Sequence, residues 1–273
     1  MLTKYIPPFD GERLLEISMR RRHTTYSHRA VTERLKVFIR NQLAVLGLDI
    51  VRVRTTGTDS RISGTFPPHG GYSSVGSPRN FFIHDGYAHR RETTYFDDTA
   101  NADRWQREVY RFAREIFDEH RLETVCDIGC GSGHKLVKYF GDRNGIGFDV
   151  AETCNWLRNK YPKLKWLVLD LKAVPPIRVD LVIAADIVEH LLEPDELLSY
   201  IAALGPKYVV LSTPDRNLLR MGTHDGPPRN TAHIREWSFA EFEAYIASRF
   251  QIVEHFISNS AQATQCILCT LRS

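Results

Sequence analysis

Three residues in the segment ADIVEHLLEPDELL could do chemistry together: Asp186, Glu189 and His190. If the segment is helical, spacings of three and four residues place these side chains on one helical face. Such a face could hold a metal ion, or an acid and a base for proton transfer. It could equally be a capping box, in which Asp186 and Glu189 bond only to backbone and His190 is an ordinary histidine. The pattern leaves these interpretations open.

Two further histidines lie in a long irregular insertion between residues 212 and 242. His224 and His233 could each act as a base or be ordinary polar loop residues. An irregular insertion of this length at a ligand-binding edge is usually functional, so we predict a substrate lid. Ser238 and Glu241 then have the spacing of a capping box, which predicts that a helix starts there.

The elements that must position these residues alternate between strand-like and helical patterns from residue 124 onward. Near-continuous apolar runs joined by helical segments predict a parallel sheet that is covered on both faces. The strand-like runs lie at 124–129, 145–150, 164–171, 179–185 and 207–213, and the helical patterns lie at 135–141, 151–161 and 194–205.

The end of the chain departs from this alternation. Two strand-like runs, at 250–258 and 263–271, are joined by a short polar link, so they must be antiparallel neighbours. A helix at 103–120 precedes the first strand, and we expect it to pack on the sheet edge. We therefore predict an α/β fold for residues 101–273: a Rossmann-like, seven-stranded, mostly parallel sheet with a terminal antiparallel strand.

Residues 1–100 form an N-terminal extension in this prediction. The extension contains an amphipathic helix at 35–46, a half-exposed strand at 49–55 and a loop rich in Gly, Ser and Pro that ends near residue 80. It could form a dimer surface or cover a substrate.

A glycine-rich stretch, VCDIGCGSGHK, joins the first strand to the next helix and contains Asp127, Gly129, Gly131 and Gly133. Glycines at such a turn let the backbone approach a ligand closely, and the helix N-terminus supplies free N–H groups. The dinucleotide fingerprint needs a glycine at its sixth place, where this chain has His134. A pyrophosphate cradle is therefore disfavoured.

Two more acidic residues end the second and third strands. Asp149, followed by Val150, is placed to accept hydrogen bonds from both ribose hydroxyls of a nucleoside. Asp170 could accept a hydrogen bond from an adenine amino group, with Leu171 against the ring. Acidic strand ends along one edge of a parallel sheet predict a nucleoside cleft.

These motifs, in this order, resemble the class I S-adenosylmethionine-dependent methyltransferases over residues 95–273. The resemblance implies S-adenosylmethionine as cofactor, with the three glycines along its methionine part, Asp149 at the ribose, and Asp170 and Leu171 at the adenine. It also places Asp127, Val150 and Ala185 among the cofactor-binding residues.

Two branches of that family are similar to this chain in the segments DIVEH, STPD and HIREW. One branch contains bacterial small-molecule O-methyltransferases, including enzymes that modify sugars. The other contains small-RNA 2′-O-methyltransferases, which hold a divalent metal through Glu-x-x-Glu-His and a distal histidine. The matching positions are Asp186, Glu189, His190 and His233, with aspartate in place of the first glutamate.

The resulting prediction is a methyltransferase that O-methylates a small polar metabolite such as a sugar or glycoside. His233 or His190 is the expected base, while Asp186 and Glu189 orient the acceptor or a divalent metal such as Mg²⁺. Metal-assisted RNA 2′-O-methylation is the first alternative. An NAD-dependent oxidoreductase and a non-catalytic scaffold are the others.

The composition is that of a globular protein, with 42% hydrophobic and 25% charged residues. A net charge of +3 is no large basic surplus, so we expect a small-molecule acceptor and no nucleic-acid partner. No apolar run reaches the roughly 20 residues that span a bilayer, and the sequence start lacks a signal-peptide pattern. We therefore expect a cytoplasmic protein without membrane contact. A homodimer that forms through the N-terminal extension is also possible.

Overall fold

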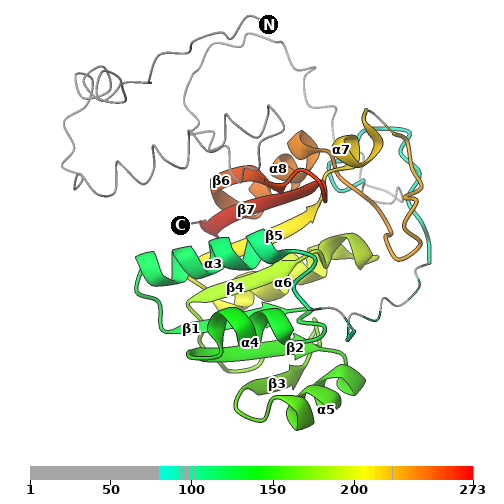
Figure 1. The fold of residues 1–273 in the computed structure, drawn as a ribbon. Coiled ribbons are helices and arrows are strands. Elements are labelled where there is room, and N and C mark those ends of the chain that lie inside the picture. The colour runs from blue at the N-terminus through cyan, green and yellow to red at the C-terminus, as the bar shows by residue number, and fades with distance from the viewer. Residues whose placement is uncertain are drawn as a thin grey trace, which may run out of the picture.

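The computed structural model describes residues 80–92, 94, 97, 99–100, 102–222 and 224–272. Its centre is a seven-stranded sheet with the order β3-β2-β1-β4-β5-β7-β6, which confirms the predicted fold class (Figure 1). The strands are β1 (Thr124–Ile128), β2 (Asn144–Asp149), β3 (Lys165–Val168), β4 (Leu181–Ala185), β5 (Tyr208–Pro214), β6 (Phe250–Asn259) and β7 (Thr264–Leu271).

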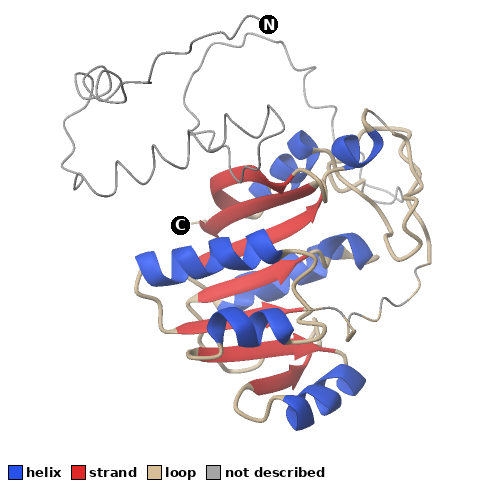
Figure 2. Ribbon diagram, viewed as in Figure 1, coloured by secondary structure: helices blue, strands red, loops and turns tan. Residues whose placement is uncertain are grey.

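Helices cover both faces of the sheet (Figure 2). They are α3 (Arg107–Glu119), α4 (His134–Phe140), α5 (Ala151–Lys160), the 3₁₀-helix η1 (Val188–His190), α6 (Pro194–Leu204), α7 (Arg216–Arg220) and α8 (Phe239–Ala247). The boundaries of α6 follow from its sequence, because Pro194 occupies the first turn and Gly205 ends the helix with a φ of 67°. The predicted capping box of Ser238 and Glu241 is present at the start of α8.

Alternate side chains of the strands enter two separate hydrophobic cores. In β4, Val182 packs with α6 and α8 on one face, whereas Leu181 and Ile183 pack with α3, α4 and α5 on the other. Burial on both faces explains why the central strand β4 is a continuous apolar run. Helix α3 lies across β4, β5 and β6, so the expectation that it packs on the sheet edge was wrong (Figure 1).

The last two strands form the antiparallel pair that the short link predicts. β7 pairs antiparallel with β6 and also with β5, while β1 to β5 are parallel to one another. The carboxyl ends of β1, β2, β4 and β5 therefore meet at one edge of the sheet. The insertion after β5 lies at this edge.

Residues 80–92 pack against the insertion after β5. The Ala88 N–H donates to the Asp225 carbonyl at 2.7 Å and the Arg90 N–H donates to the Ile234 carbonyl at 2.8 Å. The Trp237 indole donates to the Phe81 carbonyl at 2.9 Å. The helix, strand and loop predicted between residues 35 and 80 lie outside the described residues. Among the residues that are described, no helix has the length and apolarity needed to span a bilayer.

Candidate functional site

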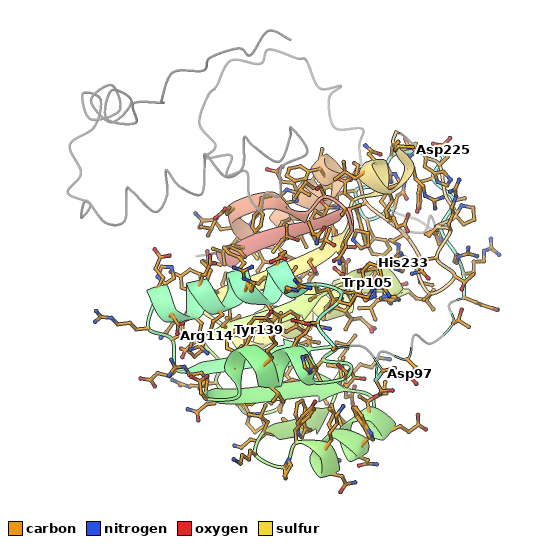
Figure 3. The ribbon with its side chains drawn as sticks, in the orientation of Figure 1. Asp97, Trp105, Arg114, Tyr139, Asp225 and His233 are labelled. Atoms are coloured by element: carbon orange, nitrogen blue, oxygen red, sulfur yellow. The ribbon has the colours of Figure 1, made fainter. Side chains whose placement is uncertain are left out.

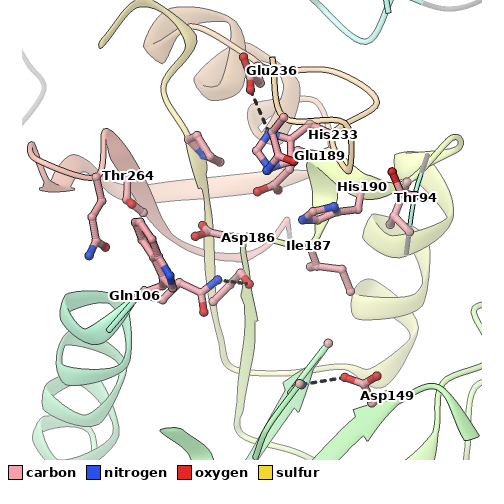
Figure 4. Close-up of a pocket in the computed structure, with 18 of the residues that line it drawn as sticks. Thr94, Gln106, Asp149, Asp186, Ile187, Glu189, His190, His233, Glu236 and Thr264 are labelled. Atoms are coloured by element: carbon pink, nitrogen blue, oxygen red, sulfur yellow. Dashed lines mark hydrogen bonds and ion pairs between the residues drawn. The ribbon is translucent and has the colours of Figure 1, made fainter. Parts of the chain in front are cut away.

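One cavity of about 650 Å³ lies at the carboxyl ends of the parallel strands. It brings together the glycine turn and the acidic cluster that the sequence places far apart (Figure 4). The predicted site residues that line it are Gly129, Gly131, Asp149, Val150, Ala185, Asp186, Glu189, His190 and His233. Figure 3 labels His233 and another lining residue, Trp105, at this edge of the sheet.

The glycine turn after β1 has a left-handed backbone at all three glycines. A Cβ atom at Gly129 would lie 2.7 Å from the Ile187 side chain, and one at Gly133 would lie 2.6 Å from Leu157. Larger residues are therefore excluded by both conformation and packing. The turn brings the backbone of Gly129 and Gly131 to the cavity wall, directly before α4 begins.

Asp149 is buried at the end of β2 and faces the same cavity. Its Oδ2 accepts a hydrogen bond from the Gly131 N–H at 2.7 Å, and its Oδ1 accepts one from the Val150 N–H at 2.8 Å. These bonds fix the carboxylate beside the glycine turn, where a ribose diol could bind. The geometry thus fits the nucleoside end of S-adenosylmethionine.

Four of the predicted cofactor residues do not line the cavity: Asp127, Gly133, Asp170 and Leu171. The Asp127 carboxylate is fully buried and accepts hydrogen bonds from the Tyr110 hydroxyl at 2.8 and 2.9 Å. Asp170 is exposed and accepts from the Lys172 N–H, and the preceding Leu169 lines the cavity instead.

The segment from Asp186 to His190 is not the start of an α-helix. Asp186 has a φ of 51°, and only the single 3₁₀ turn η1 follows, without a side-chain cap. The Ser212 hydroxyl donates to Asp186 Oδ1 at 2.5 Å and thereby ties this acid to β5. The capping-box interpretation of Asp186 and Glu189 was therefore wrong.

Glu189 is the most unusual group in the cavity wall. Its side chain is completely buried, and neither carboxylate oxygen has a well-formed hydrogen bond among the described residues, although the nearby Thr213 hydroxyl and Glu189 N–H act to lower its pKa. Burial, and then the nearby Asp186 carboxylate, raise the pKa of Glu189 well above its ordinary value. Burial also raises the pKa of Asp186, against the effect of the Ser212 hydrogen bond. A buried carboxylate without well-formed hydrogen bonds needs a group that compensates its charge.

The His190 ring is held by the insertion. Its Nδ1 lies 2.7 Å from the Ala232 carbonyl, so Nδ1 carries the proton and the lone pair of the neutral ring is on Nε2. Burial, and then the neighbouring His233, lower the pKa of His190 to about 4. The ring is therefore neutral near pH 7.

His233 approaches from the insertion with the same tautomer. Its Nδ1 lies 2.9 Å from Glu236 Oε1, which fixes the proton on Nδ1, and its Nε2 lies 2.9 Å from the Asn230 amide nitrogen. Ligand atoms of Glu189, His190 and His233 all lie within 4.8 Å of one another. Asp186, the fourth metal candidate, is not in this group.

The insertion lines the cavity, as the lid prediction expects, through α7 and the loop after it. His224 does not reach the cavity, and its Nδ1 accepts a hydrogen bond from the Gly226 N–H. The sequence interpretation missed several polar lining residues: Gln106, Arg220, Arg229, Asn230, Glu236, Gln262 and Thr264. Among these residues, only Glu236 could have been identified from the sequence, because it follows His233 by three residues.

Several solved structures are similar to this chain. Magnesium protoporphyrin IX methyltransferase from Synechocystis PCC 6803 has 17% identity and a TM-score of 0.47, with 61% of this chain and 83% of that one covered. The methyltransferase domain of bacterial CtHen1-C has 19% identity and a TM-score of 0.48, with 62% and 99% covered. The 1,6-didemethyltoxoflavin-N1-methyltransferase of Burkholderia thailandensis has 18% identity and a TM-score of 0.47, with 63% and 82% covered. A search of curated proteins gives no match.

A family model described as a methyltransferase domain matches residues 87–261. The matched segment runs from the residues that pack on the insertion, through the glycine turn and the acidic cluster, to the last hairpin. The family match gives no support to the alternative of an NAD-dependent oxidoreductase. Because the match covers well over half of the chain, the protein belongs to the methyltransferase-domain family, which confirms the prediction of a class I S-adenosylmethionine-dependent methyltransferase.

Proposed function

We propose that the protein transfers a methyl group to a hydroxyl of a small polar metabolite, such as a sugar or glycoside, with the help of a divalent metal. The observation that carries the proposal is the convergence of Glu189, His190 and His233 within 4.8 Å, in the cavity that also contains Asp149 and the glycine turn. Methyl donor and acceptor would therefore meet inside one cavity.

The three side chains fit a divalent metal. Glu189 is a buried carboxylate without a well-formed hydrogen bond, and a bound cation would compensate its negative charge. Both imidazoles carry Nε2 lone pairs and are anchored through Nδ1, which is the usual arrangement of metal-binding histidines. One oxygen and two nitrogens suit Mn²⁺, Co²⁺ or Zn²⁺ better than Mg²⁺, which prefers oxygen ligands.

The roles of the residues follow from this arrangement. A bound divalent cation lowers the pKa of a hydroxyl, so a strong protein base is not needed. Glu189 and His190 would hold the cation from η1, and His233 would hold it from the insertion, taking Nε2 away from Asn230. In a metal-free mechanism we propose His233 as the base, because Glu236 orients its ring, whereas a pKa of about 4 makes His190 a weak base.

The cavity wall supports a polar acceptor. Hydroxyl and amide side chains line it in addition to the charged groups, namely those of Thr94, Thr99, Gln106, Asn230, Gln262 and Thr264. Gln106 and Gln262 already donate to the Ala185 and Arg104 carbonyls, and the remaining donors and acceptors of these groups support the binding of a polyol. The lining by Thr94 and Thr99 also supports the proposal that the extension before residue 101 covers the acceptor. A ribose of short RNA is the second candidate acceptor, because the cluster forms at three of the four positions that the RNA-methylating branch uses for its metal.

The test is a methyl-transfer screen with radiolabelled S-adenosylmethionine. Acceptors are neutral and charged sugars, sugar nucleotides, phenols and short RNA, each with and without a chelator. We expect methyl transfer to a hydroxyl of a sugar. The chelator should abolish this activity, and added Mn²⁺ should restore it. His233→Ala should abolish it, whereas His224→Ala, a histidine of the same insertion outside the cavity, should not. If only RNA is methylated, the acceptor is the second candidate, a ribose of short RNA, and the proposal of a small metabolite fails.

A further inference from the structure

Arg220, the last residue of α7, lines the cavity next to the histidine cluster. Its side chain is only 6% exposed, and Nη1 is shielded from solvent without a hydrogen-bond partner. Among the described residues, its one charged neighbour is Glu236, whose Oε2 lies 3.8 Å from Nη2. This distance is too long for a hydrogen bond.

Two other buried arginines of the described residues form hydrogen bonds through both terminal nitrogens, unlike Arg220. Arg216 pairs with both carboxylate oxygens of Glu241 at 2.8 and 2.9 Å and donates to the Glu236 carbonyl. Arg235 donates to the carbonyls of Leu191 and Leu192, each at 2.9 Å. Both side chains thus use their two terminal nitrogens within the fold, although Nε of Arg216 has no partner, whereas Nη1 of Arg220 is buried without a hydrogen bond.

A guanidinium group stays charged in proteins, so loss of a proton cannot lower the free-energy cost of burying it. Glu236 compensates the charge only in part, because its other oxygen is bonded to His233 Nδ1. A guanidinium has five donors in a planar fork that matches the oxygens of a carboxylate or phosphate. A buried fork that faces a cavity with unused donors is thus suited to an anionic ligand.

A second arginine of the same insertion, Arg229, lines the cavity as well. It is exposed and lies just before Asn230, the residue that contacts His233. The two arginines therefore provide positive charge on the acceptor side of the cavity, away from the glycine turn and Asp149.

We propose that Arg220, assisted by Arg229, binds an acidic substituent of the methyl acceptor. The acceptor is then a polyol that carries a phosphate or a carboxylate, such as a sugar phosphate or a uronic acid. The proposal rests on the proposed O-methylation and narrows its substrate class. Arg220 acts as a specificity-determining residue, since the acidic group would be bound while a neighbouring hydroxyl reaches the cluster.

The kinetic test compares a hexose, the corresponding hexose phosphate and the hexuronate as acceptors. We expect a higher kcat/KM for one or both charged sugars than for the hexose. Arg220→Gln should lower the ratio of charged to neutral kcat/KM about 30-fold, and Arg220→Lys should lower it less, because lysine keeps the charge but loses the fork. Arg107→Gln, a substitution of an exposed arginine of α3, is the matched control.

A binding test separates this proposal from the proposed function. Inorganic phosphate is titrated into the protein saturated with S-adenosylhomocysteine, and we expect binding that Arg220→Gln weakens about 10-fold or more. Equal phosphate binding by wild type and Arg220→Gln would overturn the subsite, as would equal kcat/KM for hexose and both charged sugars. If no sugar is methylated but phosphate binding depends on Arg220, the O-methylation of polyols fails and the anion subsite remains.

Discussion

The imidazole rings of His190 and His233 meet edge to face, with centroids 4.9 Å apart and planes at 85°. One ring comes from the turn after β4 and the other from the insertion after β5, so the contact joins two strand ends of the sheet. Each ring is fixed through Nδ1 by a different acceptor, the Ala232 carbonyl and the Glu236 carboxylate. The contact brings the two rings together beside Glu189, where a shared ligand would take His233 Nε2 from the Asn230 amide.

Substitution of Asp149 should weaken cofactor binding. Asp149→Asn keeps the shape but leaves a poorer acceptor for the ribose hydroxyls, and we expect S-adenosylhomocysteine to bind about 10-fold or more weakly, a loss of about 1.5 kcal/mol. Asp170→Asn is the matched control, because Asp170 does not line the cavity and should have the smaller effect. Calorimetric titration measures both. Unchanged affinity in Asp149→Asn would remove this acid from the cofactor site.

Glu236 should control metal binding through His233. Glu236→Gln removes the charge that holds the Nδ1 proton, and such neighbours of metal ligands typically change metal affinity by about 10- to 100-fold. We expect a loss of Mn²⁺ affinity in this range, with cofactor affinity preserved.

Glu243→Gln is the control for that substitution. Glu243 is half-exposed and lies 3.6 Å from another buried histidine, His255, outside the cavity. Glu243→Gln should leave the Mn²⁺ affinity unchanged from that of wild type. Equal affinities in wild type and Glu236→Gln would mean that Glu236 does not position the ring.

His255 should make stability sensitive to acid. Burial lowers the pKa of His255 to about 4 from an ordinary 6.5, so the unfolded chain binds the proton more readily than the folded one. Stability is then lost as the pH falls below 6.5, and the loss is complete below 4. The contribution of this residue is about 2 kcal/mol between pH 7 and pH 5.

Urea unfolding at pH 7 and pH 5 checks this prediction. His255→Gln retains a donor for Gln265 and removes the titrating ring, so the variant should lose about 2 kcal/mol less than wild type over this interval. The same pH dependence in both proteins would show that the pKa of His255 is not lower in the folded than in the unfolded chain.

The parallel part of the sheet could be predicted because its strands are short, largely apolar segments with an acidic residue at or just after the carboxyl end of several of them. Asp149 was placed correctly at the cavity, since both the strand and its acidic end are local patterns. Asp170 follows the same pattern, yet its carboxylate turns to the Lys172 N–H. The end of a strand determines the position of a residue, but the turn that follows determines the direction of its side chain.

The acidic cluster was harder to predict, because its conformation depends on contacts from distant residues. The spacing of Asp186 and Glu189 fits a helix cap, but the Ser212 hydroxyl on β5 holds Asp186 in a left-handed conformation. Glu189 is consequently directed inward and buried. The partners within the insertion, such as Arg220, have no periodic pattern that could reveal them, since the insertion has little regular structure.

The most direct test of the central claim is a titration of Mn²⁺ into the protein saturated with S-adenosylhomocysteine. The account predicts one site per chain, with affinity reduced about 100-fold or more in Glu189→Gln and in His233→Ala, and unchanged in His224→Ala. Absence of Mn²⁺ and Zn²⁺ binding, or equal affinity in wild type, Glu189→Gln and His233→Ala, would contradict it.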